Sequence, residues 1–501
     1  MDRRSLLIGG GLLLGTAACS QPTFGDDSSD RIPLPIPPLM DARENRQSLA
    51  LRAQSGTTPF YPGRPSNTLG YNGSYLGPTI RVHRGDDVSM AVTNALEVDT
   101  TVHWHGLLIP GELDGGPHQI IRPGATWRPT LPIRQPAATL FYHSHGHGST
   151  AEQVYTGLAG ALLITDDEEQ GLGLPSEYGV DDLPLLIQDR QFERGQLVLP
   201  TGMMIAMQGR RGDTILVNGA PNPFARVPNR LVRLRLVNAS NARIYDFSFS
   251  DRRSFHWIGT EGGLLDRSVE LQTLALAPAQ RAELLVNFED GRPVSLVTGP
   301  DANASMMGMM GGTGRRRQAA GAQTVLRFEP QPSGKARTSG SLPTVLVSRT
   351  RPDAATAVQR RRLVLNMGMG MDGGMGMGSG MGMDGGMGMD GGGMTFAING
   401  KPFDMSRIDE RVRLGSTEIW EVSGEMMRHP IHIHGVHFDV LSRNGKAPDV
   451  LDQGPRDTVL VQEPVELLIR FDQPATKFPF MYHCHILEHG DNGMMGQFSV
   501  A

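Results

Sequence analysis

Short runs of alternating hydrophobic and polar residues recur along the whole chain. Clear examples are residues 79–83, 87–92, 231–237 and 418–422, each bounded by Gly, Asn or Asp. Successive side chains of a strand point to opposite faces, so this alternation predicts half-buried β-strands joined by turns. The composition agrees, with 63 glycines and 35 prolines in 501 residues and only 6% aromatic residues. The pattern therefore predicts a soluble, all-β protein.

A weak internal repeat predicts that the strands form similar domains. Tyr71-Asn72-Gly73, Val217-Asn218-Gly219 and Ile398-Asn399-Gly400 each precede a proline-containing loop and then a strand. We expect three Greek-key β-sandwich domains, at residues 40–166, 183–330 and 344–501. Linkers are expected near residues 166–182 and 331–343.

The first 18 residues are typical of an export signal. Arg3 and Arg4 precede an apolar run that ends in a small-residue cleavage site at Ala18. The run is too short to cross a bilayer as a stable helix. We expect twin-arginine-like export to the periplasm, a route that carries folded proteins with their cofactors. A lipid anchor on Cys19 is the alternative, and it would be the one attachment to a membrane.

Residues 367–394 form a low-complexity insertion of ten Met, fourteen Gly, three Asp and one Ser. So many glycines disfavour a helix, so the methionines do not follow a helical core pattern. A plain linker is the stronger alternative, but linkers use Ser and Thr rather than oxidisable thioethers. Thioethers select Cu(I), so we interpret the insertion as a copper-capturing segment.

Ten of the fifteen histidines fall in four clusters. These are His103-Trp104-His105, His143-Ser144-His145, His429 with His432 and His434, and His483 and His485 with His489. Because side chains alternate along a strand, each His-x-His pair places two imidazoles on one face. Four converging pairs would unite eight histidines, a set suited to three coppers with open positions for oxygen. Only His256 lies between His147 and His429, so the first and last domains are expected to supply the ligands.

The segment around Cys484 adds a second kind of site. The chain has two cysteines, and loss or lipidation of Cys19 leaves Cys484 without a disulfide partner. Cys484, His489 and Met494 offer thiolate, imidazole and thioether, the ligands of a blue-copper electron-transfer site. On a strand, Cys484 points away from the face that carries His483 and His485. One strand would then serve two metal sites and give electrons a short covalent route between them.

These four segments resemble the copper signatures of the multicopper oxidases, and the match covers nearly the whole mature chain. The resemblance implies cupredoxin-like domains and four copper ions. It implies a type 1 copper on His429, Cys484 and His489, with Met494 as the axial ligand. It further implies a type 2 copper on His103 and His432, and a type 3 pair on His105, His143, His145, His434, His483 and His485.

Within that family, the methionine-rich insertion looks most like the periplasmic cuprous oxidases of bacterial copper tolerance. The resemblance implies a substrate-copper site at Glu425 and Met427, although the acid at the first position is usually Asp. Asp114 matches an acidic residue thought to assist proton delivery beside the type 2 copper. Gly490 stands where some relatives have a glutamate of the proton path, and Asp491 or Glu488 is expected to substitute.

These expectations define a function that can be compared with the structure. We expect an enzyme that oxidises Cu(I) to Cu(II) and reduces O2 to water. The alternatives are a laccase-like oxidase of phenols or aromatic amines, and a non-enzymatic Cu(I) buffer that uses the inserted methionines. The net charge of −5 gives no basic surface for nucleic acid, and we expect a monomer.

Overall fold

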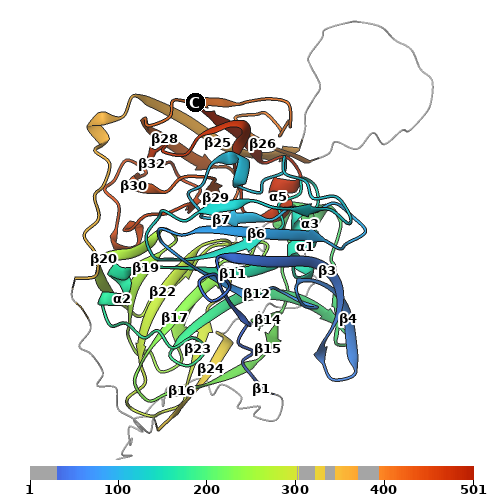
Figure 1. The fold of residues 1–501 in the computed structure, drawn as a ribbon, viewed down its shortest axis with the longest axis vertical. Coiled ribbons are helices and arrows are strands. Elements are labelled where there is room, and N and C mark those ends of the chain that lie inside the picture. Colours follow the sequence, from blue (N-terminus) through green and yellow to red (C-terminus); the bar gives the residue numbers. More distant parts are fainter. Residues whose placement is uncertain (1–30, 302, 304–321, 333–342, 344, 370–393) are drawn as a thin grey trace, which may run out of the picture.

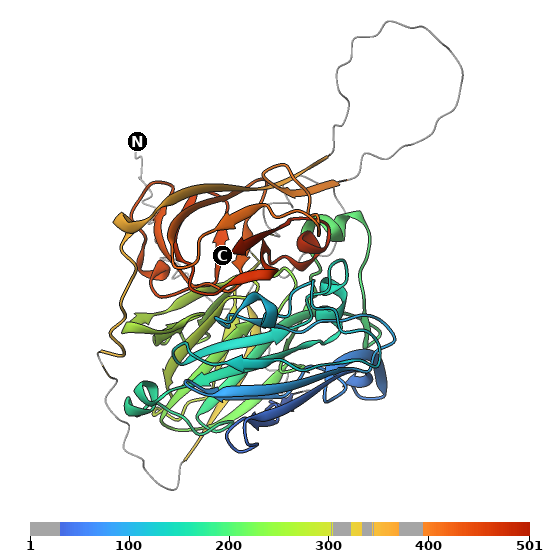
Figure 2. The same cartoon turned by 45° about the horizontal axis from the view of Figure 1, so that its top comes forward.

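The computed structural model describes residues 31–301, 303, 322–332, 343, 345–369 and 394–501, and most of the ordered elements are strands. Six sheets pair into three sandwiches, which appear in Figure 1 as blue-to-teal, green-to-yellow and orange-to-red bodies. Figure 2 shows the third sandwich lying across the other two. The predicted all-β fold of three sandwiches is confirmed. Among the described helices, none has both the length and the apolar character needed to cross a bilayer.

The first sandwich packs two sheets around a core that contains Trp104 and Tyr142. One sheet has the order β2 (Leu39–Asp41), β5 (Thr79–His83), β11 (Ala159–Thr165), β10 (Ala138–His143) and β7 (His103–His105). The other has the order β4 (Arg64–Tyr71), β3 (Ser48–Tyr61), β6 (Asp87–Asn94) and β8 (Thr126–Trp127), with β9 (Thr130–Pro132) beside β6.

The middle sandwich has the largest sheet and a core that contains Trp257. That sheet runs β15 (Ala220–Pro221), β14 (Thr214–Val217), β12 (Asp182–Glu193), β17 (Leu231–Asn238), β22 (Arg281–Asn287), β19 (Phe255–Thr260) and β20 (Gly263–Leu271), with β13 (Gln196–Val198) on β12. The facing sheet runs β1 (Ile32–Pro33), β16 (Pro223–Pro228), β24 (Gln323–Gln331), β23 (Val294–Thr298), β18 (Tyr245–Phe249) and β21 (Thr273–Leu276).

The third sandwich packs around Trp420, and Cys484 belongs to the same core. One sheet runs β26 (Met394–Ile398), β25 (Gln359–Met369), β28 (Thr417–Gly424), β32 (Val465–Arg470) and β30 (Phe438–Arg443). The other runs β27 (Glu410–Val412), β34 (Met495–Val500), β33 (Ala475–Cys484), β29 (His429–Ile433) and β31 (Thr458–Val461). Short helices join the strands: α1 (Thr150–Thr156), α2 (Asp167–Gly171), α3 (Met203–Gln208), α5 (Leu487–Asp491) and 3-10 turns at Gly111–Leu113, Ala354–Thr356 and Val450–Asp452.

The Asn-Gly repeat proves to be one turn built three times. Asn72, Asn218 and Asn399 have positive φ angles of 57°, 51° and 52°, a conformation that asparagine tolerates better than most residues. The side-chain amide oxygen of each asparagine accepts a backbone N–H from a neighbouring strand. Its side-chain amide N–H donates to the backbone carbonyl that lies two residues earlier in that same strand. The partners are Arg52 and Ala50, Leu186 and Pro184, and Val364 and Arg362. The repeat therefore marks equivalent points in the three sandwiches.

The methionine-rich insertion is shorter than its composition suggested. Residues 367–369 and 394 belong to strands β25 and β26, where Met367 pairs with Phe396. Met367 continues the alternation of Leu363 and Leu365 and is buried in the core, so strand periodicity overrides composition at this end. Residues 370–393 lie outside the described part of the chain, as do the expected signal at 1–18 and Cys19.

Candidate metal centre

Two antiparallel strand pairs align the clustered histidines. In the first sandwich, β7 and β10 place His103 opposite His143. In the third, β29 and β33 place His432 opposite His483. Within each of the four His-x-His pairs the ring centroids lie between 4.8 and 5.9 Å apart. Both imidazoles of every pair therefore lie on one face, as the spacing predicted.

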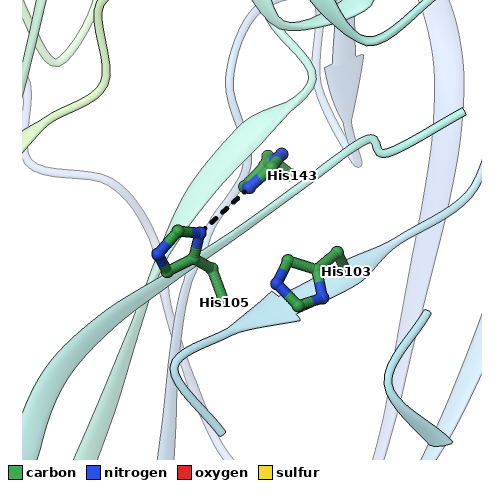
Figure 3. Close-up of side chains that lie close together, drawn as sticks. All are labelled: His103, His105 and His143. Carbon is green, nitrogen blue, oxygen red and sulfur yellow. Dashed lines mark hydrogen bonds between the residues drawn. The ribbon is translucent and has the colours of Figure 1, made fainter. Parts of the chain in front are cut away.

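Eight histidines from the first and third sandwiches meet in one buried cluster. They are His103, His105, His143, His145, His432, His434, His483 and His485, and each is at most 4% exposed. Figure 3 shows three members from the first sandwich, with the rings of His105 and His143 directed at one another. Rings from opposite sandwiches stack, with centroids 3.9 Å apart for His103 and His434 and 3.6 Å apart for His105 and His432. The middle sandwich gives no histidine to this cluster.

Hydrogen bonds at the outer edge of this cluster use the N–H of the imidazoles, so the ring nitrogens that face inward are bare, that is, without a proton. His103 Nδ1 donates to the Asp114 carbonyl at 2.9 Å, and His432 Nδ1 donates to the Asp457 carbonyl at 2.9 Å. A neutral imidazole carries one N–H, so the opposite Nε2 atoms have only lone pairs. These two Nε2 atoms face each other at 3.4 Å. Facing lone pairs repel, and a metal cation bound to both removes that repulsion.

The same arrangement recurs between His105 and His143. His105 Nε2 donates to the Asp457 carboxylate at 3.2 Å, and His143 Nδ1 donates to the Ser144 carbonyl at 2.7 Å. The remaining nitrogens, His105 Nδ1 and His143 Nε2, lie 3.3 Å apart without a proton between them. This pair is a second place where the side chains fit a metal ion.

A third such place lies around His483. His434 Nδ1 donates to the Asp114 carboxylate at 2.7 Å, and His483 Nδ1 donates to the Cys484 carbonyl at 3.0 Å. His483 Nε2 therefore faces His434 Nε2 at 3.2 Å and His145 Nε2 at 3.1 Å as a bare acceptor. Three sets of bare nitrogens in one cluster match the donor chemistry that copper prefers.

Burial keeps the imidazoles of His483 and His485 neutral. Burial, together with nearby imidazoles that disfavour a second positive charge, lowers the pKa of His483 to about 3. The pKa of His485 is lowered well below its usual range for the same reasons, and neither of its ring nitrogens has a hydrogen-bond partner within the described residues. Neutral imidazole is the form that binds metal, so these side chains are ready to act as ligands.

Cys484 lies in a second site on the opposite side of its strand. Its Sγ is 3.5 Å from His429 Nδ1 and 3.6 Å from His489 Nδ1. The other ring nitrogens donate outward, from His429 Nε2 to the Glu425 carbonyl at 2.9 Å and from His489 Nε2 to the Met207 carbonyl at 3.0 Å. Both Nδ1 atoms are therefore bare and face the sulfur. These three side chains form one of the groups in the described structure that could hold a metal ion.

Burial determines which side chains of this second site carry a proton. It raises the pKa of the Cys484 thiol well above its ordinary value and lowers the pKa of His429 to about 4. Met494, the expected axial ligand, is fully buried, and its backbone carbonyl accepts the Cys484 N–H at 3.1 Å. Sulfur and imidazole donors of this kind fit copper.

Two aspartates hold the cluster histidines in a crossed arrangement. Asp114 of the first sandwich binds His103 through its carbonyl and His434 through its carboxylate. Asp457 of the third sandwich binds His432 through its carbonyl and His105 through its carboxylate. The sequence singled out Asp114 through the family pattern. It gave no signal for Asp457, which lies in no histidine motif.

A second contact that the sequence did not predict comes from helix α3. The Met207 carbonyl of this helix accepts the N–H of His489 on the side of the ring that faces away from Cys484. The helix is flanked by Gly202 and Gly209, both with positive φ angles, and none of its residues is fully buried. Helix α3 therefore covers the cysteine site from the middle sandwich, and Figure 1 shows it beside α5.

The remaining predicted residues lie near these sites in different settings. Glu425 is exposed and contacts His429 only through its backbone carbonyl, whereas Met427 is buried in the core of the third sandwich. The Asp491 carboxylate accepts backbone N–H groups at the start of α1, and burial raises its pKa to about 7. Glu488 instead pairs with Arg210 of the middle sandwich.

Comparison with known proteins corrects the expected function. The chain is 39% identical to the cell division protein FtsP of Xenorhabdus nematophila, over 93% of this chain and 92% of that protein. Other bacterial relatives with the same name match nearly the whole chain. The expectation of a cuprous oxidase for copper tolerance, with its two alternatives, is therefore wrong. The substrate-copper roles of Glu425 and Met427 belonged to that function and are not retained.

The family itself is well supported. Two multicopper oxidase family models match residues 52–169 and 383–501. The multicopper oxidase mco of Staphylococcus aureus is 34% identical over 95% of this chain and 94% of its own. A laccase-like multicopper oxidase, CueO of Ochrobactrum sp., has a solved structure with 36% identity and a TM-score of 0.82, covering 94% of this chain and all of that one. The match extends across all three sandwiches and both metal sites, and the chain belongs to the multicopper oxidase family.

Proposed function

We propose that this chain is a copper-dependent oxidase that passes electrons to O2. The observation that supports it most strongly is the completeness of both sites. Every histidine that the family pattern assigns to copper is buried, either in the eight-histidine cluster or beside Cys484. Where the hydrogen bonds fix the tautomer, the nitrogen that faces the site is bare. Family membership implies copper binding, and we propose four ions, one beside Cys484 and three among the eight histidines.

The chain itself connects the two sites. Copper in them would supply one-electron transfer at the cysteine and reduction of O2 at the histidines. His483 and His485 are the covalent neighbours of Cys484, and His483 Nδ1 also donates to the Cys484 carbonyl at 3.0 Å. An electron that enters at Cys484 therefore has a route through bonds rather than through space.

Asp114 is suited to handle the protons that oxygen reduction consumes. Its Oδ2 accepts the His434 N–H at 2.7 Å, whereas its Oδ1 is buried and has no hydrogen-bond partner among the described residues. A buried carboxylate oxygen without a protein donor is a natural place for a proton or for a water that carries one. We propose that Asp114 passes protons to the cluster.

The test compares copper content, the visible copper–thiolate band and oxygen uptake in the purified copper-loaded protein. We expect about four coppers per chain, a strong band, and oxygen uptake with a synthetic one-electron donor. Cys484→Ser should abolish the band and the uptake, and His483→Gln should abolish the uptake while keeping the band. His256→Gln, outside both sites, is the matched control. A fully loaded wild-type protein that consumes no oxygen would refute the proposal.

A role in cell division is the second proposal, and the FtsP relatives support it. We propose that the chain acts in the periplasm in division, after export directed by its N-terminal segment. Cell length in a deletion strain measures this role, with complementation by wild type and by Cys484→Ser. Restoration by wild type alone ties division to the oxidase chemistry. Equal restoration by both makes the role independent of copper, and failure of both contradicts a division role.

A further inference from the structure

The carboxylate of Asp457 is fully buried and fully bound. Arg281 donates to its Oδ1 at 2.8 Å and to its Oδ2 at 2.5 Å. His105 Nε2 and Thr458 Oγ1 also donate to Oδ1, at 3.2 and 2.8 Å. Every one of these four hydrogen bonds ends on a carboxylate oxygen. The group is therefore held in one position as an acceptor.

All the donors of the Arg281 guanidinium are also hydrogen-bonded. Arg281 belongs to the middle sandwich, which supplies none of the expected copper ligands. It begins strand β22, is fully buried, and has five N–H groups on its guanidinium. Two point to Asp457, and the other three have carbonyl acceptors on Thr139, Ala279 and Glu261. Thr139 belongs to the first sandwich, Ala279 and Glu261 belong to the middle sandwich, and Asp457 belongs to the third. Arg281 can hold Asp457 in place only when all three are docked.

This fixed carboxylate determines how two histidines face the cluster. Arg281 donates to both oxygens of this carboxylate, so the carboxylate accepts from His105. The proton of His105 then sits on Nε2, and Nδ1 is left bare toward His143. The Asp457 carbonyl does the same for His432 by accepting its Nδ1 proton, so that Nε2 is bare toward His103. One residue thus sets the donor nitrogen of a histidine in each of two sandwiches.

Asp114 and Asp457 share this geometry but differ in what is left over. Asp114 retains a buried oxygen that has no partner in the part of the chain that the structure describes, whereas both oxygens of Asp457 accept from Arg281. Asp114 has room for a proton, and Asp457 has none without losing its arginine. Of the two aspartates, only Asp114 can therefore take up a proton without losing a hydrogen-bond partner.

We propose that Asp457, held by Arg281 of the middle sandwich, is a positioning residue that presents His105 and His432 to copper. The inference rests on the proposed copper chemistry. It also gives the middle sandwich a role, which is to hold the first and third sandwiches in the geometry that retains copper in the histidine cluster. Residues that orient metal-ligating histidines in this way typically change metal affinity about 10- to 100-fold when they are replaced.

The experiment measures how fast a chelator removes copper from each site in the complete, copper-loaded protein. The visible copper–thiolate band reports the cysteine site, and total copper minus that site reports the histidine cluster. For Asp457→Asn we expect cluster copper to be retained about 10- to 100-fold less well while the band persists. Arg281→Gln should cause the same selective loss, because the carboxylate then loses its anchor.

The matched control is Glu283→Gln, which breaks a buried acid–arginine contact within the middle sandwich, alters the hydrogen bond from Thr139 of the first sandwich, and touches no ligand histidine. It should leave the copper retention of both sites unchanged. If Asp457→Asn fails to fold, Arg281→Lys gives the same comparison, because one ammonium cannot make both carboxylate contacts. Unchanged cluster retention in these variants overturns the proposal, and so does equal loss from both sites or in the control.

The result of this copper-retention experiment can be distinguished from the result of the test for oxidase activity. Copper retention is measured without oxygen turnover, so a protein that binds cluster copper but consumes no oxygen contradicts the oxidase and leaves the positioning role standing. A wild-type protein that takes up no copper in the histidine cluster overturns both.

Discussion

Copper uptake by the cysteine site should release one proton per ion near neutral pH. Burial raises the pKa of the Cys484 thiol far above neutrality, so the thiol is protonated in the copper-free chain. Burial also lowers the pKa of His429 to about 4 and that of His489 well below its usual range, so both are neutral. Copper binds the thiolate and the neutral imidazoles. Only the thiol therefore has a proton to lose.

The size of the effect follows from this count. Between about pH 6 and pH 8, the apparent affinity should rise about tenfold per pH unit, or about 1.4 kcal/mol, because one proton is released throughout that window. The assay titrates the copper-free protein at several pH values against a competing chelator and follows the copper–thiolate band. An indicator dye counts the released proton directly.

Two variants test the assignment of that proton. Cys484→Ser should remove the proton release of this site, because a serine hydroxyl does not ionise in the window, and His256→Gln should leave it unchanged. A pH-independent affinity would mean that the thiol is already ionised. A slope of two or more protons would mean that His429 or His489 is protonated. Either result refutes the reasoning from burial.

Three further predictions concern other parts of the molecule. Asp114→Asn should retain copper, because the amide oxygen can still accept from His434, but oxygen uptake should fall about 100-fold or more, the usual contribution of a proton-transfer group. Replacing helix α3 with a Gly-Ser linker of equal length should expose His489 and raise kcat/KM several-fold for a bulky synthetic donor, since one hydrogen bond of about 1 kcal/mol closes that edge. Glu283→Gln should lower the free energy of unfolding by about 3–5 kcal/mol, measured by denaturant titration, because it leaves two buried arginines without their shared carboxylate.

The acid sensitivity of Glu283 follows from the same contact. Burial alone would raise the pKa of Glu283, but Arg233 and Arg235 lower it from 4.5 to about 2. Its stabilising contribution is therefore complete above about pH 4.5 and is lost as the pH falls toward 2. The wild-type protein should lose more stability across that window than Glu283→Gln. Identical acid profiles would contradict the assignment.

Controls separate these effects from general damage. Asp114→Asn should leave the copper–thiolate band unchanged, and a loss of copper would show that the aspartate is needed for binding rather than for proton transfer. The α3 replacement should leave kcat/KM for a small donor nearly unchanged. An equal rise for donors of both sizes would mean that the helix does not restrict access.

Periodicity predicted the parts of the structure that depend on local sequence. The His-x-His spacing placed each pair on one face because strand geometry alone fixes that relation. The separate faces of Cys484 and His483 follow from the same alternation. The Asn-Gly repeat located equivalent turns because the left-handed conformation is a local preference of asparagine. None of these inferences required knowledge of what packs against the strand.

The features that the sequence did not predict depend on contacts between distant segments. Asp457 meets His105 and Arg281 only after three sandwiches dock, and no spacing along the chain encodes that meeting. Helix α3 covers His489 through a backbone carbonyl, which leaves no trace in residue identity. Met367 was assigned to the insertion by composition, although its place in the alternation with Leu365 indicated a core position.

Function was the least accessible from sequence. The clustered histidines and Cys484 indicate what the sites can bind, whereas the setting in which the protein acts depends on partners that the sites do not encode. The relatives named FtsP corrected that part of the prediction, and with it the substrate-copper roles of Glu425 and Met427. Chemistry and cellular role are thus separate inferences for this chain, and each needs its own experiment.

The most direct test of the central claim is the ratio of donor electrons consumed to O2 consumed by the copper-loaded protein. Complete reduction of O2 to water takes four electrons, and a cluster that receives them through Cys484 should give that ratio without free peroxide. We predict a ratio of about four for wild type and no turnover for Cys484→Ser. A ratio near two with accumulating peroxide, or no oxygen uptake by a fully loaded wild-type protein, would contradict the account.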